Sequence, residues 1–406
     1  MTGFVSTGSA WREIPAHEAL RRARAAAPLV AITRITDITP LDRIGLPCAV
    51  AVRPGAMAGS LCVTAGKGLT ITDALVGAAM EGIELAWAEP GKSPVRPVMA
   101  TARDVLDGRT RPRAILDFAP RLGSIIDLDA PYPCVWAEDL ATGGQVLVPA
   151  EAVFYPMNLP GCFLGSTTNG LASGSSVEEA TLHGLSEVIE RDAFSFNRLM
   201  NPPRIDGGTL PEPLAGMDRR LHAHGFETWY FEMRNPFGIP CVGASIYDHD
   251  DRRMIYGGQG CHPSPAIAVA RALTEAIQSR LSIIHGGRDD VVAIVNQQPP
   301  RSWEEMRAFY ESSQEELAVT SPPRDFAGIP DVSHACGSIP EGIAFLCGRL
   351  REQGMPWVLR VVLSPPDFPV AVVRVMVPRL ECRTTADPTK VGPRLRDFMK
   401  GRASYP

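Results

Sequence analysis

Acidic side chains recur with helical spacing in three separate segments of the chain. The segments Met80–Glu84, Ser186–Glu190 and Thr274–Gln278 share the pattern Glu-x-Ile, followed by Glu or Gln. Each lies in a stretch otherwise rich in Ala, Leu, Val and Ile, and buried carboxylates are costly unless cations or metals accompany them. The pattern therefore predicts three equivalent helices whose polar faces converge on one place.

The second segment shows how such a helix can gather acids on one side. A helix is predicted from Ser176 to about residue 199, with Ser176 and Glu179 as a capping box. Helical geometry places Glu179 and Glu190 about 20° apart in projection, and Glu187 about 80° from Glu179. All three can face one site. His183, a lone histidine among Ala and Leu, is interpreted as a packing residue outside the mechanism.

These helices carry more acids than cations. Within one helix an ion pair accounts for an acid, but Arg191 and Arg271 are too few to neutralise the whole set. A hard divalent cation would supply the missing charge, and magnesium prefers oxygen ligands while leaving positions for phosphate oxygens. The six acids are Glu81, Glu84, Glu179, Glu187, Glu190 and Glu275.

Lys67 adds a cation close to the first helix. It lies between Gly66 and Gly68 at a predicted strand-to-helix turn, where its ammonium and the backbone amides could contact phosphate. The Gly-Lys-Gly sequence lacks the rest of a phosphate-loop pattern, and taken alone a surface turn accounts for it better.

Strand and helix patterns alternate irregularly, which favours an α+β fold with antiparallel sheets over a doubly wound sheet. Residues 91–160 are proline-rich and strand-like, and are expected to form a variable insertion added to the rest of the fold. Strands are predicted at 46–53, 60–65, 227–233, 240–247, 253–257, 357–363 and 369–376. Helices are predicted at 15–27, from Thr72 or Asp73 as N-cap to 89, and at 176–199, 265–284, 303–318 and 340–353.

Composition excludes several classes of protein. The 406 residues are 45% hydrophobic, enough for a large core, and the net charge of −5 with a pI near 6.0 argues against a nucleic-acid partner. The sequence contains no run of 18 apolar residues, so no membrane span is predicted. Nine cysteines without a Cys-x-x-Cys pair, and no secretory start, indicate reduced thiols in the cytoplasm rather than a zinc site.

The chain resembles the YcaO family in four stretches that occur in the family's order. The run Ser166–Gly174 leading into Glu178–Ala193 resembles the signature core of YcaO domains. The other stretches are Leu41–Pro47, Ala65–Leu69 with Glu81 and Glu84, and Gly258–Pro263 with Arg271, Glu275 and Gln278. They span about residues 12–285, and residues 300–406 are expected to complete a single domain covering 1–406.

The resemblance implies a YcaO-type fold in which carboxylate-rich helices surround a central site for ATP and Mg²⁺. Ala172 falls where family members place a small polar contact, and it has no hydroxyl to offer. By position, the implied metal ligands are Glu81, Glu84, Glu187 and Glu190. The implied catalytic residues are Glu187, Glu190, Arg191 and Arg271, and the implied nucleotide contacts are Lys67, Ser175, Glu179, Arg191, Arg271 and Glu275.

The implied reaction is ATP-dependent phosphorylation of a peptide amide oxygen in a ribosomally made substrate. The nucleophile decides the product: sulfide gives a thioamide, a substrate Cys, Ser or Thr gives an azoline, and an amine gives an amidine. The run through Arg43 and Arg53-Pro54 resembles members encoded with a TfuA partner, so thioamide formation is placed narrowly first. The tail ends in a single proline, Pro406, unlike the proline-rich tails of many azoline-forming members.

Two other classes of function are weighed against this one. A non-catalytic peptide-binding scaffold would be expected to have lost the acids, which this chain retains. A small-molecule ligase or kinase would be expected to show a phosphate loop or kinase motifs, which are not found. A precursor peptide and a TfuA-like or leader-binding protein are the expected partners, and a homodimer is left open.

Overall fold

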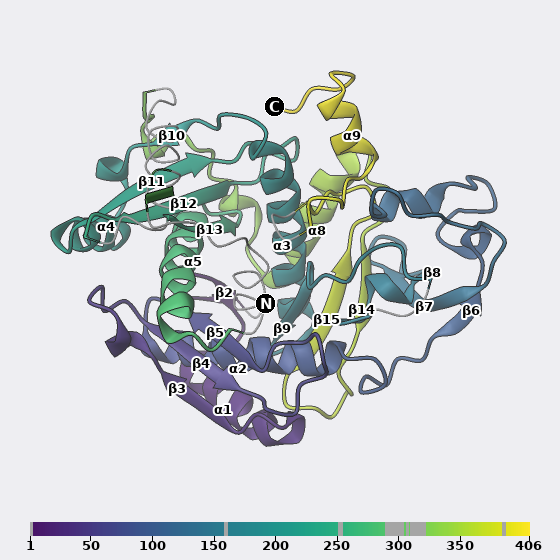
Figure 1. Cartoon of the computed structure of the whole chain (residues 1–406), viewed down its shortest axis with the longest axis horizontal. Coiled ribbons are helices and arrows are strands. Elements are labelled where there is room, and N and C mark those ends of the chain that lie inside the picture. The colour runs from purple at the N-terminus through teal and green to yellow at the C-terminus, as the bar shows by residue number, and fades with distance from the viewer. Residues whose placement is uncertain are drawn as a thin grey trace.

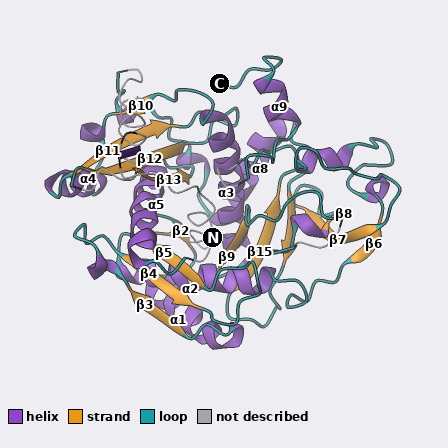
Figure 2. Ribbon diagram, viewed as in Figure 1, coloured by secondary structure: helices purple, strands orange, loops and turns teal. Residues whose placement is uncertain are grey.

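The computed structural model describes residues 3–157, 161–250, 255–288, 304–305, 308, 322–383 and 387–406. Within these residues, every pairing between two named strands is antiparallel, so the predicted α+β class is confirmed. Helices separate three main sheets, and a small ribbon of β1 (Val5–Ser6) and β2 (Trp11–Arg12) lies near the centre (Figures 1 and 2).

The first sheet is three-stranded and carries two helices. Strands β3, β4 and β5 follow one another in space as they do in sequence. Helix α2 packs on β4 and β5, and α1 packs on α2. The bounds are α1 Ala16–Ala26, β3 Arg34–Asp37, β4 Cys48–Val52, β5 Val63–Lys67 and α2 Ile71–Ala88.

Helix α2 begins two or three residues earlier than the predicted caps at Thr72 or Asp73 would place it. The N-cap is Thr70, whose backbone is extended and whose hydroxyl accepts a hydrogen bond from the Asp73 amide. Thr70 and Asp73 thus satisfy the first turn together, which makes the sequence prediction wrong by two or three residues.

The second sheet has four strands in the order β10-β11-β12-β13, and α5 packs across β12 and β13. Helix α4 packs on β11 and contacts α5. The bounds are β10 Arg204–Ile205, α4 Leu214–Ala223, β11 Phe226–Glu232, β12 Cys241–Asp248, β13 Ile255–Cys261 and α5 Pro265–His285.

The third sheet joins distant parts of the chain. Strands β14 and β15 return from the C-terminal region to pair with β7 and β9, and α3 packs on β9 and β15 with α8 beside it. Its strand order is β6-β7-β14-β15-β9, with β8 on β7. The bounds are β6 Val98–Ala100, β7 Tyr132–Asp139, β8 Gln145–Pro149, β9 Leu171–Gly174, α3 Val177–Asn197, α8 Ile339–Glu352, β14 Leu359–Val362, β15 Ala371–Met376 and α9 Pro393–Met399.

Glycines let two of the central helices lie directly on their strands. A Cβ added to Gly66 of β5 would come within 2.1 Å of the Ala74 carbonyl oxygen in α2. One added to Gly260 of β13 would come within 2.1 Å of the Ala268 carbonyl oxygen in α5. These close contacts bring α2 and α5 near α3, whose contacts reach β13 as well as β9 (Figure 1).

Most predicted elements occur with shifted ends. The segment 91–160 contains β6, β7 and β8 between short 3₁₀ turns, as the strand-like pattern indicated. The predicted helix at 303–318 lies almost entirely outside the described residues. No helix in the described part of the chain combines the length and apolar character that crossing a bilayer requires.

A buried ion pair fixes the end of α2, the helix that carries Glu81 and Glu84. Arg53 Nη2 lies 2.6 Å from Glu89 Oε1, and both side chains are almost completely inaccessible. The same carboxylate oxygen accepts the Met57 amide at 2.9 Å, which ties the β4–β5 connection to the helix end. Removing Arg53 would leave the buried Glu89 carboxylate with a single cation, the partly exposed Lys92, whose Nζ lies 2.7 Å from Oε2.

We therefore expect Arg53→Met to lower the free energy of unfolding by about 3 kcal/mol, as measured by urea titration followed by circular dichroism. The matched control is Arg103→Met, which breaks the exposed pair with Asp129 and is expected to leave the free energy of unfolding nearly unchanged. Equal effects of the two substitutions would show that burial of the Arg53 pair does not hold this region.

Candidate active site

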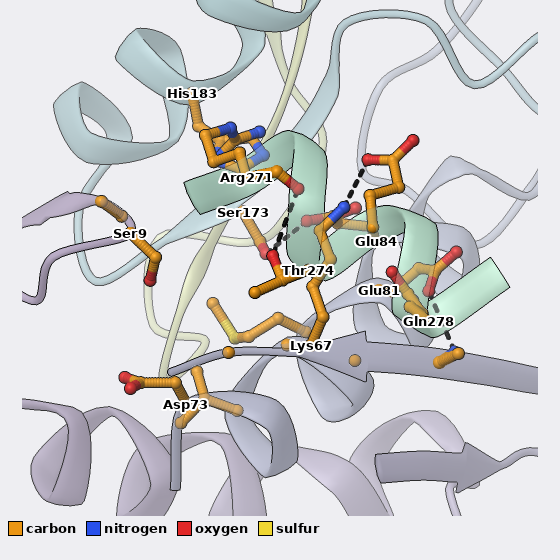
Figure 3. Close-up of a pocket in the computed structure, with 18 of the residues that line it drawn as sticks. Ser9, Lys67, Asp73, Glu81, Glu84, Ser173, His183, Arg271, Thr274 and Gln278 are labelled. Carbon is orange, nitrogen blue, oxygen red and sulfur yellow. Dashed lines mark hydrogen bonds and ion pairs between the residues drawn. The ribbon is translucent and has the colours of Figure 1, made fainter. Parts of the chain in front are cut away.

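A cavity of about 690 Å³ lies where α2, α3 and α5 meet β5 and β9 (Figure 3). Its size falls in the range of small-molecule and cofactor sites. All ten residues singled out from the sequence line it, although they come from segments more than 200 positions apart. They are Lys67, Glu81, Glu84, Ser175, Glu179, Glu187, Glu190, Arg191, Arg271 and Glu275.

The acids of α2 are held by short polar contacts from neighbouring strands. The Ser173 hydroxyl on β9 donates to Glu84 Oε1 at 2.6 Å, and the Ala65 amide on β5 donates to Glu81 Oε2 at 3.1 Å. Burial raises the pKa of Glu84 to about 8, and the charges of Glu81 and Glu187 add to the increase although Ser173 opposes it. Glu84 is thus an acid whose ionised form lacks sufficient positive charge nearby.

The acids of α3 share this deficit. Burial raises the pKa of Glu187 to about 7, with Glu190 adding repulsion and Arg191 opposing it. Burial and the neighbouring Glu275 also raise the pKa of Glu190. The Oε2 atom of Glu190 is buried and has no hydrogen-bond partner among the described residues. A cation at this position would satisfy that oxygen and lower both pKa values.

Among the cations that line the cavity are Lys67, Arg191 and Arg271, and only part of their hydrogen-bonding capacity is used. Lys67 Nζ donates to Glu275 Oε2, and although burial opposes ionisation, Lys67 lowers the pKa of Glu275. Arg191 Nη1 donates to Gln259 Oε1 at 3.1 Å, and its Nε lies 3.9 Å from Glu187. The Nε atom of Arg271 is buried without a partner in the described structure. These unused donors suit an anion such as phosphate.

Lys67 reaches this place from a strand rather than from the predicted turn. It is the last residue of β5, paired with Cys48 of β4, and its side chain crosses to α5. The prediction of a strand-to-helix turn centred on Lys67 is therefore wrong. The turn comes after it, and pairing in the sheet gives the ammonium a fixed direction.

Glu179 differs from the other acids because its oxygens are already bonded. Arg12 Nη1 donates to its Oε1 at 3.1 Å, and the Ser175 hydroxyl and the Glu13 amide donate to its Oε2 at 2.6 and 3.0 Å. Glu179 and Ser175 thus bind the N-terminal segment to the start of α3. Arg12, whose position matches a basic contact that YcaO proteins often have near the N-terminus, also lines the cavity.

Further polar side chains line the cavity without having been assigned a role, among them Ser173, His183 and Thr274. His183 does face the site, in contrast to its interpretation as a packing residue (Figure 3). Burial lowers its pKa well below the usual value, and the charges of Arg271 and Arg12 reinforce the effect, so its imidazole is neutral. The sequence did contain a signal for this orientation, since His183 and Glu187 lie only about 40° apart around the helix axis.

The residues present fit a magnesium ion that is shared with a phosphate ligand. Within the described residues, no three His, Cys, Asp or Glu side chains are close enough to enclose a metal by themselves. Magnesium commonly takes one or two carboxylates and completes its octahedron with phosphate oxygens and water. The partnerless Glu190 oxygen and the raised pKa values of Glu84 and Glu187 mark where such carboxylates are available.

Comparison with known proteins places the chain among relatives of similar length. An uncharacterized protein of Methanothermobacter thermautotrophicus is 37% identical over 91% of this chain and 95% of its own. A Rhizobium leguminosarum bv. trifolii protein, known as an uncharacterized protein in the tfuA 3′ region, is 31% identical over 92% and 89%.

The solved structures include a similar protein with a bound nucleotide analogue. It is YcaO from Methanopyrus kandleri, bound with AMPPCP and Mg²⁺, which is 27% identical, has a TM-score of 0.78 and aligns over 97% of this chain and 98% of its own. The family model described as YcaO cyclodehydratase, ATP- and Mg²⁺-binding, matches residues 65–381. This match covers all three acid-bearing helices. The chain belongs to the YcaO family.

Proposed function

We propose that the protein is a magnesium- and ATP-dependent enzyme that phosphorylates a backbone amide oxygen of a ribosomally made peptide or protein. The observation that carries the proposal is the meeting of under-neutralised carboxylates and unused arginine donors in one cavity. The family match, and the nucleotide analogue and Mg²⁺ bound to the Methanopyrus kandleri relative, support the same conclusion.

In this proposal the carboxylates and the cations have separate tasks. Glu81, Glu84, Glu187 and Glu190 would supply carboxylates to magnesium, one or two to each ion, and the metal would spread the charge of the transferred phosphoryl group. Arg191 and Arg271 bind phosphate oxygens, with Lys67 and Glu275 beside them. Ser175 and Glu179 complete the nucleotide site on the N-terminal side, where Glu179 is already bonded to Arg12.

The same proposal covers the wider organisation of the protein. Residues 1–406 form one domain in this proposal, and the support is that β14 and β15 complete a sheet with β7 and β9. The protein is proposed to act in the cytoplasm. A precursor peptide or protein is the substrate, and a TfuA-like or leader-binding protein assists. The support for this partner is the relative in the tfuA 3′ region.

Calorimetric titration of magnesium with a non-hydrolysable ATP analogue tests the site. We expect Glu190→Gln to weaken binding at least about tenfold, because an amide cannot replace the buried carboxylate oxygen as a metal ligand. Glu178→Gln, an exposed acid in the first turn of the same helix, is the matched control and should bind like the wild type. Equal affinity of the two variants would contradict the assignment.

The pH dependence of this binding provides a second test. Since the pKa values of Glu84 and Glu187 lie at about 8 and about 7, both are partly protonated at neutral pH and must lose protons to bind metal. Affinity should therefore increase from about pH 6 to about pH 8, with proton release at pH 7 measured in buffers of different ionisation heat. Glu84→Gln should reduce the release.

The same shifts predict how stability depends on pH without nucleotide. A carboxyl whose pKa is higher in the folded state contributes stability below its unfolded pKa and loses that contribution as the pH rises through the folded value. The thermal midpoint of the free protein should thus fall between about pH 6 and about pH 8, and magnesium with nucleotide should reverse the fall. A rising midpoint in the free protein would contradict the shifts.

Among the nucleophiles, we place sulfide narrowly first, ahead of an internal Cys, Ser or Thr and then an amine. Mass spectrometry of candidate precursor peptides separates the products, since exchange of oxygen for sulfur requires added sulfide whereas azoline formation only removes water. We expect sulfur incorporation that Glu187→Gln abolishes. Loss of water independent of sulfide would establish the azoline alternative, and no ATP-dependent change in any peptide would favour a scaffold.

A further inference from the structure

A second, smaller cavity lies behind the proposed nucleotide site and has a different electrostatic character. Its volume is about 70 Å³, and its walls come from β15, the segment 164–169, Asp117, Glu151, the segment 377–382 and Lys390. The two cavities share a wall: Thr168 lines the large cavity, whereas Thr167 and Asn169 on either side of it line the small one.

Two buried cations face the small cavity. Arg374 is 1% exposed, and its Nε and Nη2 donate to the carbonyl oxygens of Ala152 and Thr167. Its Nη1 is buried and has no partner in the described structure. Lys390 is 7% exposed, and its Nζ donates to the carbonyl oxygen of Leu164 at 2.9 Å. In the described residues, neither cation forms an ion pair with a carboxylate.

The acids that line this cavity are engaged elsewhere. Both oxygens of Glu151 accept backbone amides, from Phe163 at 2.8 Å and from Gly165 at 2.7 Å. Asp117 is paired with Arg111 and Arg379. Burial raises the pKa of the Cys382 thiol, which keeps it neutral. The cavity thus presents a guanidinium and an ammonium to one buried carboxylate, Glu151, whose charge raises the pKa of Lys390 without forming an ion pair with it among the described residues.

Burial opposes both charges, which is the expected effect of a missing counter-ion. It lowers the pKa of Arg374 to about 10, leaving the guanidinium cationic at neutral pH, and it also lowers the pKa of Lys390. An anion in the cavity would reverse these shifts. The cavity has room for a small anion of one or two heavy atoms, not for a nucleotide.

One acceptor in the wall narrows the identity of the anion. The Oδ1 atom of Asn169 is buried without a hydrogen-bond partner in the described part of the chain, and it needs a donor. Chloride offers only acceptor capacity. Hydrosulfide offers an S–H group to Asn169 together with a negative sulfur to Arg374 and Lys390, and it is the main form of dissolved sulfide above neutral pH.

We propose that the cavity between Asn169, Arg374 and Lys390 is a binding site for hydrosulfide, placed behind the wall at 167–169 to supply the nucleophile to the neighbouring site. The inference rests on the proposed function and selects thioamide formation among its branches. A cationic cavity also disfavours an ammonium, which argues against amidine formation here.

The proposed reaction balances without an oxidant or a reductant. The sulfur of hydrosulfide forms a bond to the amide carbon, and the amide oxygen takes the terminal phosphoryl group of ATP. The carbon–oxygen bond then breaks, so that phosphate leaves with the oxygen and with the proton that hydrosulfide brought. The products are the thioamide, ADP and hydrogen phosphate.

Chloride NMR on the purified full-length protein tests the site without a peptide substrate. We expect wild-type protein to broaden the chloride line and added sodium hydrosulfide to reverse part of that broadening. Asn169→Asp should abolish the part of the chloride broadening that hydrosulfide reverses, because the new carboxylate places a negative charge in the cavity. Lys390→Met should weaken hydrosulfide competition roughly tenfold. The control Arg103→Met alters an exposed pair and should behave like wild type.

Broadening in Asn169→Asp equal to wild type, or chloride that hydrosulfide cannot displace, would overturn the proposal. In a thioamide assay, Lys390→Met should raise the KM for sulfide about tenfold and leave the KM for ATP unchanged. A purely structural role would instead alter both constants or thermal stability alone, and would also overturn it. Hydrosulfide binding at this cavity without thioamide product would retain the anion site while removing the favoured reaction.

Discussion

The cost of burying carboxylates without enough cations is the constraint on which the centre of this molecule depends. Glu84, Glu187 and Glu190 come from two helices, and burial raises the pKa of each. Such an arrangement is unfavourable for stability alone, since well-packed apolar residues would cost less. It would become favourable if, as proposed, a divalent ion and a nucleotide occupied the cavity. Tight packing, such as the close contact between Gly66 and the backbone of α2, holds the helix that carries Glu84 in place.

Helix α3 shows the difference between an acid held for structure and an acid held for a ligand. Asp192 accepts the Glu381 amide at 2.8 Å and Arg394 Nη1 at 2.6 Å, and the Tyr405 hydroxyl donates to it at 3.2 Å. Glu190, two residues earlier, projects about 200° away and has a buried oxygen with no partner in the described structure. One face of the helix is closed by the C-terminal tail, and the other is left to be completed by a ligand.

The C-terminal tail packs against the structural face of α3. Tyr405 stacks on Phe196 with ring centroids 3.9 Å apart, so the chain end is fixed near the C-terminal half of the helix. Pro406 is not among the residues that line the large cavity. The contacts observed for Tyr405 in this tail are therefore with α3.

The sequence predicted the large cavity well because its key residues repeat within helices, where periodicity fixes relative direction. The three acid-bearing helices and the eight site residues on them were found in this way, whereas Lys67 came from the Gly-Lys-Gly sequence and Ser175 from the resemblance to the YcaO family. Lys67 was misplaced because Gly-Lys-Gly resembles a turn, and only pairing with Cys48 shows it to be in a strand. The small cavity gave no local signal. Asn169, Arg374 and Lys390 lie in separate irregular or strand segments, so no periodic sequence pattern indicates that they meet. Only the tertiary fold brings them to one cavity.

The two cavities also resolve an electrostatic conflict within the proposed reaction. An anionic nucleophile entering the acid-lined cavity would be repelled by Glu187 and Glu190, while a free cation pair inside that cavity would compete with magnesium for them. Separation by the wall at 167–169 lets each charge have its own counter-ion. Arg374 remains close enough to oppose the raised pKa that burial gives Glu187, so the two compartments are electrostatically coupled. An anion bound at Arg374 would weaken that influence and favour the cation on the other side.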